Sequence, residues 1–195
     1  MKRLICLLLA FAMVFTIAGC KKRSGDSETS RGAPAQASVE PVVFPTEVQP
    51  PDTLPVNELF RMVNLLMEDY EGEIFTFDKD SAMQSKPLPQ FDDVMYKYNI
   101  DDLEIVISAG VNSDCFISAY FRMTFDDELA STEQAFFASF FLHVLEPEKY
   151  ISMLDEIYAD GFIDMYNESA EQKSASGDSW EVLYNGGFLY ISPRA

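Results

Sequence analysis

Residues 93–125 read DVMYKYNIDDLEIVISAGVNSDCFISAYFRMTF, and this stretch decides the fold. Apolar side chains recur at every second position in three runs, which Asp101-Asp102 and the segment 110–114 separate. A period of two is the pattern of a β-strand with one buried face, and short polar breaks between such runs indicate antiparallel neighbours. The stretch therefore predicts three consecutive strands of an antiparallel sheet with one apolar and one more polar face.

The third run assigns its residues to the two faces of the sheet. Cys115, Ile117 and Phe121 are in phase with one another, so we expect them on the core face. Phe116 and Tyr120 are out of phase with them and are expected on the more polar face, because successive side chains point to opposite sides of a strand.

Helical periodicity appears on both sides of this stretch. Apolar residues recur at three- and four-residue spacing from Asn57 until Gly72, which predicts a first helix. Ser131 and Gln134 match a capping box at the start of a second, nearly all-apolar helix. Pro147 opens a third helix.

Two further elements complete the expected fold. A short strand is predicted around residues 74–77, and a hairpin is predicted over residues 180–192 with an Asn185-Gly186 turn. The predicted order is α-β-β-β-β-α-α-β-β. We therefore expect an α+β fold, in which helices pack on one face of an antiparallel sheet of about five to six strands.

Four aromatic residues form the candidate partner-binding surface. Trp180 and Tyr184 share one side of the hairpin, and Phe116 and Tyr120 lie on the more polar face of the sheet. If the four converge, they form an apolar patch that suits a protein, peptide or glycan partner. The alternative is that a helix or the preceding tether covers them.

The N-terminus carries the most specific motif of the chain. Met1-Lys2-Arg3 is a short basic segment, residues 4–17 form an uncharged apolar run, and Ile17-Ala18-Gly19-Cys20 follows. Fourteen apolar residues suit a signal peptide better than a membrane-spanning helix, which needs about twenty. The four residues that end at Cys20 resemble the lipobox of bacterial lipoproteins, an aliphatic residue and two small residues before a cysteine.

The lipobox resemblance implies a cellular location. In such lipoproteins the cysteine thiol receives a diacylglyceryl group and the peptide before it is removed, so residues 1–19 would be the signal peptide and Cys20 the lipidation site. Lys21, in place of an aspartate, implies the outer membrane if the cell is Gram-negative. The alternatives are an ordinary secreted protein in which Cys20 plays no part, or an uncleaved short anchor.

Composition divides the rest of the chain into a tether and a domain. Residues 20–52 are rich in Ser, Gly, Ala, Glu and Pro and predict a disordered tether. Residues 53–195 hold 8 Lys/Arg and 27 Asp/Glu, a net charge of −19, and predict a single domain. Such an acidic domain repels phosphate backbones, so no nucleic-acid partner is expected.

The reactive side chains of the domain fit no catalytic or metal-binding pattern. Ser139 and His143 lie four residues apart on the predicted second helix, but no orienting carboxylate or oxyanion donors accompany them. Cys115 is expected in the core, where a thiol is inert. The acidic clusters match no EF-hand loop and are expected to lie in solvated turns; they are Asp78/Asp80, Asp92/Asp93, Asp101/Asp102 and Asp126/Asp127/Glu128. We predict no enzyme activity, no cofactor and no metal.

These observations define the expected function. We expect a membrane-anchored binding or assembly module of the cell envelope, with the membrane bound through Cys20 and an envelope protein or other macromolecule as its partner. The alternative is a lipoprotein that binds a small ligand or a cation.

Overall fold

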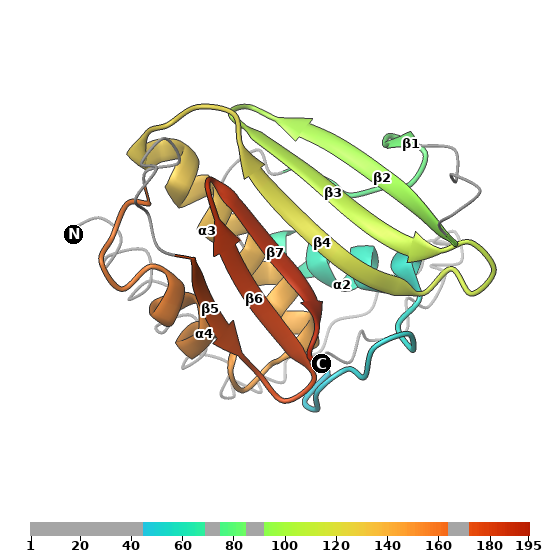
Figure 1. Ribbon diagram of the computed structural model, residues 1–195. Coiled ribbons are helices and arrows are strands. Elements are labelled where there is room, and N and C mark those ends of the chain that lie inside the picture. Colours follow the sequence, from blue (N-terminus) through green and yellow to red (C-terminus); the bar gives the residue numbers. More distant parts are fainter. Residues whose placement is uncertain (1–44, 69–74, 85–91, 164–171) are drawn as a thin grey trace, which may run out of the picture. The chain divides into compact units, whose positions relative to one another are not determined.

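Seven antiparallel strands form one sheet, in the order β1-β2-β3-β4-β7-β6-β5, in the computed structural model (Figure 1). The structure describes residues 45–68, 75–84, 92–163 and 172–195. The predicted α+β class and antiparallel sheet are confirmed, with more strands than the expected five to six. The strands are β1 (Met83–Gln84), β2 (Asp93–Ile100), β3 (Leu103–Gly110), β4 (Phe116–Met123), β5 (Lys173–Ser176), β6 (Trp180–Asn185) and β7 (Phe188–Pro193). The helices are α2 (Val56–Glu68), α3 (Glu128–Leu145) and α4 (Tyr150–Ile157).

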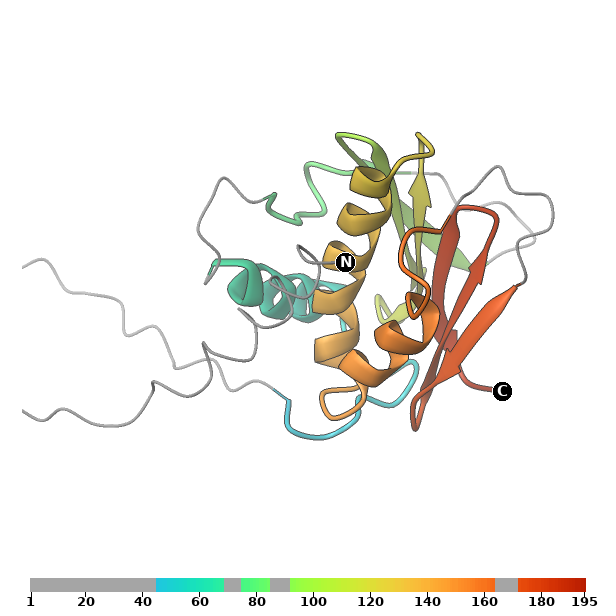
Figure 2. The same cartoon turned by 90° about the vertical axis from the view of Figure 1, so that its left-hand side faces the viewer.

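The helices lie on one side of the sheet (Figure 2). The face toward them, called here the inner face, buries alternate residues of the central strands, as the period of two predicts. Ile105 and Ile107 of β3 are fully buried there and pair with Phe121 and Ala119 of β4. The three strands expected from residues 93–125 are therefore confirmed as β2, β3 and β4.

Helix α3 is the buried centre of the structure, but it begins earlier than the capping box predicts. Its N-cap is Asp127, whose carboxylate accepts a hydrogen bond from the backbone N–H of Ala130 at 2.7 Å. Ser131 lies inside the first turns and is buried, so the predicted cap at Ser131 is wrong. Asp127 caps as well as serine does and allows the helix one more turn.

Gln134 links α3 to the sheet and to the segment after α4. Its buried side-chain amide donates hydrogen bonds to the backbone carbonyls of Phe121, at 2.6 Å, and of Gly187, at 2.9 Å. The Tyr158 hydroxyl donates to the Gln134 side-chain oxygen at 2.7 Å. Each polar atom of this amide thus has a partner, which is what permits its complete burial.

Two predicted segments differ in the structure. Residues 75–77 of the expected short strand are irregular, because the Asn64 side chain occupies both backbone groups of Phe77 at 2.9 Å each. Conversely, β5 is a strand that the sequence pattern does not predict, because it lies in a polar segment. Lys173, Ser174 and Ser176 are polar and Ala175 is the only buried residue of β5, so the strand has no apolar period of two.

Residues 45–52 lie against the domain, although their composition assigns them to the tether. We call this segment the strap. The backbone N–H of Gln49 donates to the carbonyl of Leu145, at the end of α3, at 3.0 Å. Its carbonyl accepts a hydrogen bond from the indole of Trp180, the first residue of β6. The strap therefore joins the end of the main helix to the last hairpin.

Glu146 holds the turn between β5 and β6. One oxygen of its fully buried carboxylate accepts hydrogen bonds from the backbone N–H groups of Ser179, at 2.7 Å, and Trp180, at 2.9 Å. The carboxylate also lies against Gly177, where an added Cβ would be 2.4 Å from the Glu146 carboxyl carbon. A glycine is thus required at position 177 because the side chain of Glu146 fills the space.

Candidate functional site: the outer face of the sheet

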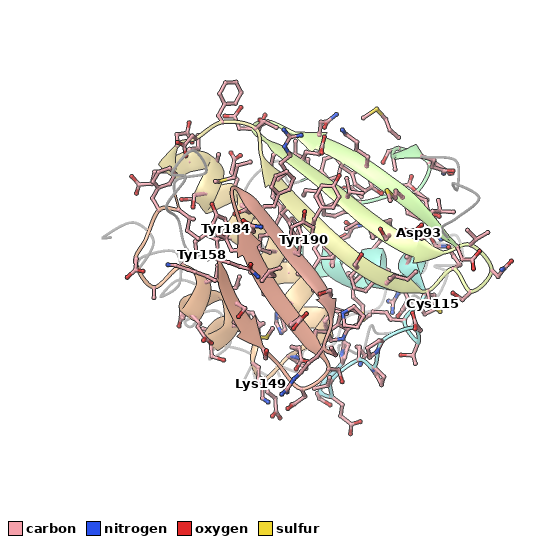
Figure 3. All side chains as sticks on the ribbon, viewed as in Figure 1. Asp93, Cys115, Lys149, Tyr158, Tyr184 and Tyr190 are labelled. Atoms are coloured by element: carbon pink, nitrogen blue, oxygen red, sulfur yellow. The ribbon has the colours of Figure 1, made fainter. Side chains whose placement is uncertain are left out.

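The face of the sheet opposite the helices, called here the outer face, carries the candidate site. No helix of the described ranges lies over it (Figure 2). Strands β4 and β7 pair at its centre, with Tyr120 opposite Tyr190 and Arg122 opposite Phe188. Figure 3 shows Tyr190 projecting from the middle of this face. The site is therefore built on regular, paired strands rather than on loops.

Tyr120, Phe188 and Tyr190 form one ring cluster, which we call the outer aromatic cluster. Phe188 and Tyr190 stand two residues apart on β7, and their rings are nearly parallel, with centroids 6.0 Å apart and an interplanar angle of 20°. The Tyr120 ring lies 5.8 Å from Tyr190 and 6.3 Å from Phe188. Tyr190 is 37% exposed and is the most exposed ring of the cluster.

Charged groups surround the outer aromatic cluster. The guanidinium of Arg122 lies over the Phe188 ring, 5.4 Å from its centroid, in cation–π geometry. The Tyr120 hydroxyl donates to Glu104 at 3.4 Å, and Glu104 also pairs with Lys97. Burial, followed by the nearby Glu104 charge, raises the pKa of Tyr120, so its hydroxyl stays protonated and remains a donor.

The strand register places the cluster in a continuous band across the sheet. Each member of the band is the cross-strand neighbour of the next, at a spacing of about 5 Å. The band runs from β2 to β5 through Lys97, Val106, Tyr120, Tyr190, Leu183 and Ser174. Its apolar centre, in which Val106 is buried and Tyr190 is exposed, lies between polar ends, an arrangement that is common in binding surfaces.

Three of the four aromatic residues expected in the candidate surface are buried on the inner face. Phe116, Trp180 and Tyr184 are each at most 1% exposed. Phe116 and Trp180 do come together, with ring centroids 5.1 Å apart, but inside the core. The Tyr184 hydroxyl accepts a hydrogen bond from the backbone N–H of Gly187 at 2.9 Å. Only Tyr120 lies on the outer face, so these four residues do not form the expected exposed patch.

A β-bulge explains why Phe116 changes face. Ser108 pairs with Ser118 but Ala109 pairs with Phe116, so Ile117 is an extra residue in β4. One inserted residue reverses the side to which every earlier side chain points. Phe116 therefore enters the core, and Cys115, expected in the core, is only partly buried. Its thiol donates to the Ser113 carbonyl at 3.5 Å.

Ser139 and His143 both lie on α3, and each side chain has a contact within the helical layer. The Ser139 hydroxyl donates to the carbonyl of Phe136 in its own helix at 2.6 Å. The His143 ring stacks on Tyr150, with centroids 4.4 Å apart and an interplanar angle of 3°. Burial lowers the pKa of His143, which favours its neutral form. Both side chains thus contribute to the packing of α3.

The acidic groups expected in turns lie at strand and helix ends. Asp78 accepts a hydrogen bond from the backbone N–H of Asp80 at 3.1 Å, and Asp101 has a positive φ of 45° in the β2–β3 turn. Within the described ranges, no group of three His, Cys, Asp or Glu side chains is arranged to hold a metal ion. Binding of a cation or a small ligand remains a prediction that these contacts do not test.

No known family model, no curated protein and no solved structure matches the chain. Cys20 and the predicted signal peptide of residues 1–19 lie outside the described residues, so both remain predictions. None of the helices in the described ranges combines the length and the apolar content that crossing a bilayer requires.

The sequence pattern identified one member of the outer aromatic cluster and missed two. The outward position of Tyr120 could be predicted because Tyr120 lies between Ala119 and Phe121, which are both buried. The same alternation in β7, where Leu189 and Ile191 are buried, places the intervening positions on the outer face. The phase of the last hairpin was therefore the signal that could have identified its two outward rings.

Proposed function

We propose that this chain is a lipid-anchored, non-enzymatic binding module of the cell envelope, which recognises a macromolecular partner through the outer aromatic cluster. The observation that carries the proposal is the group formed by Tyr120, Phe188 and Tyr190, with Arg122 beside it, on a sheet face that no described helix covers. Tyrosine and arginine are enriched where protein interfaces gain most of their binding free energy.

The rigidity of the site supports recognition of a preformed surface. Tyr120 and Tyr190 project from paired strands, and their backbones are bound into the ladder on both sides. Such side chains lose little conformational freedom on binding, which reduces the entropic cost of association.

The membrane part of the proposal rests on the lipobox resemblance at Cys20. Replacing Cys20 with alanine should abolish incorporation of a labelled fatty acid and block the removal of residues 1–19, which follows lipidation in such lipoproteins. A Cys115→Ala variant is the matched control, because it removes the other cysteine after the signal peptide and should leave both readouts unchanged. Fatty-acid labelling that persists in Cys20→Ala would contradict lipid attachment at this residue.

Site-specific photocrosslinking in intact cells tests the binding surface. A photoreactive phenylalanine analogue at position 190 should give crosslinked products of higher mass. The same analogue at position 151 is the control, since Ile151 is 46% exposed on α4, behind the sheet. Products that form equally at both positions, or none at position 190, would refute the outer face as the binding surface.

A further inference from the structure

The end of the sheet next to the outer aromatic cluster carries a second exposed feature, which we call the acidic corner. Here the β2–β3 turn, the β4–α3 connection and the β6–β7 turn lie at one end of the sheet (Figure 1). The backbone N–H of Thr124 donates to the carbonyl of Asp102 at 2.8 Å and fixes the first two connections against each other. The corner comprises Asp101, Asp102, Phe125, Asp127, Leu129 and Glu133.

The carboxylates of the acidic corner lie close enough to repel one another. The pKa of Glu133 is raised, first by burial and then by the negative charges of Asp101, Asp102 and Asp127. None of the five ion pairs among the described residues involves Asp101, Asp102 or Glu133. The corner is therefore a concentrated negative charge that the described part of the chain leaves unneutralised.

Two large apolar side chains project from the same segment. Phe125 is 60% exposed and Leu129 is 61% exposed, and these are the highest exposures of any large apolar residue in the described ranges. They flank Asp126-Asp127-Glu128 in the sequence. Exposed apolar side chains beside like charges favour an amphipathic partner, because such a partner covers the apolar groups and neutralises the charges together.

The acidic corner is continuous with the outer aromatic cluster. Phe125 follows Arg122 by three residues along β4 and its exit, and the backbone N–H of Met123 donates to the carbonyl of Gly187, the residue before Phe188, at 3.0 Å. A partner that covers the cluster and extends over the end of β4 would reach the corner.

We infer that the partner recognised by the outer aromatic cluster is a protein with a cationic, amphipathic segment, which lies on the acidic corner. This inference rests on the proposed function and adds the chemical class of the partner. Charge complementarity selects a cationic segment for this end of the sheet. A second copy of the chain is disfavoured, since two domains of net charge −19 repel each other.

The test uses the full-length protein in intact cells, with the photoreactive phenylalanine analogue at position 125. We expect crosslinks to a peptide rich in lysine or arginine, identified by mass spectrometry of the product. A linked segment that is neutral or acidic, or a product that is a lipid or a glycan, would overturn the inference.

Charge variants provide the second arm of the test. The double variant Asp101→Asn/Asp102→Asn keeps side-chain size, and asparagine tolerates the positive φ of Asp101. We expect it to lower the crosslinking yield at position 125 about three- to tenfold, the combined effect of two partly exposed ion pairs. The control Asp155→Asn/Glu156→Gln removes the same charge from exposed positions on α4 and should leave the yield unchanged.

The outcomes separate the two proposals. Crosslinks at position 190 that persist while the corner variant has no effect at position 125 overturn the cationic partner and retain the binding surface. Loss of specific crosslinks at position 190 overturns the binding surface itself. An equal decrease in both double variants would show that overall charge, rather than the acidic corner, attracts the partner, and would also overturn the inference.

Discussion

The indole Nε1 of Trp180 donates a hydrogen bond to the backbone carbonyl of Gln49 at 2.5 Å, across 131 residues of sequence. This contact closes the strap over the end of the core, because Trp180 is fully buried and also packs on Phe116. The segment that leads to the N-terminus is thus fixed to the hairpin that forms the other end of the chain.

Replacing Trp180 with phenylalanine should destabilise the domain by about 2–3 kcal/mol. The variant loses the indole donor, leaves the Gln49 carbonyl without that partner and opens a small cavity. Urea unfolding followed by circular dichroism measures the free energy. Tyr190→Phe is the control, since it alters an exposed ring of the outer face, and should change the free energy by less than about 0.5 kcal/mol. Equal stabilities of the two variants would contradict a structural role for the strap contact.

Replacing Glu146 with alanine should cost about 2–4 kcal/mol of unfolding free energy. The backbone N–H groups of Ser179 and Trp180 would lose their shared acceptor in a buried position. Thermal and urea unfolding provide the measurement, and Glu148→Ala, at an exposed position two residues later, is the control. If both variants unfold alike, the carboxylate of Glu146 does not hold the β5–β6 turn.

His143 should make stability fall as the solution is acidified. Its folded-state pKa lies below the usual 6.5 because the ring is buried, so the unfolded chain takes up the proton first as pH falls. Its contribution is fully present above pH 6.5 and is lost as pH falls below that value toward the lowered pKa. His143→Phe keeps a ring to stack on Tyr150 and should show a shallower loss of stability as pH falls below 6.5. An unchanged slope would argue against this assignment.

Glu133 should make stability fall as pH rises, which is the opposite of the effect of His143. Its folded-state pKa is raised above 4.5, so the folded chain binds the proton more tightly and stability decreases as pH rises from 4.5 through the raised pKa. Glu133→Gln should therefore stabilise the domain at neutral pH, by less than about 1 kcal/mol because the group is partly solvated, and have little effect below pH 4.5. Glu156→Gln, at an exposed position of α4, is the matched control. A neutral-pH loss of stability in Glu133→Gln would contradict charge repulsion at the acidic corner.

The fold class could be predicted because the sheet has one buried face. Apolar residues then alternate with more polar ones in the sequence of β2 and at Leu103, Ile105 and Ile107 of β3, although Val106 and Ser108 of β3 are buried as well. The last hairpin could also be predicted, from the glycines of its turn. Gly186 and Gly187 have positive φ angles of 54° and 79°. The turn itself lies one residue later than the sequence pattern places it.

The candidate site was harder to predict because it depends on register. Phe116 and Tyr120 look equivalent in the sequence, but the extra residue Ile117 lies between them and sends Phe116 into the core. The extra residue is recognisable only once β3 and β4 are paired, so no pattern within one strand reveals it. The packing of the strap on the domain could not be predicted for a related reason. Gln49 is held by hydrogen bonds to a backbone carbonyl and from a distant indole, and no apolar repeat marks these contacts in the sequence.

The short strands at the two edges of the sheet affect the tendency of this protein to aggregate at high concentration. At one border of the sheet, β1 pairs through only two residues, and at the other β5 is a four-residue strand that begins with Lys173. Brief, polar borders give a neighbouring molecule little backbone on which to extend the sheet. Copies of the domain at high local concentration would therefore resist joining edge to edge into aggregates.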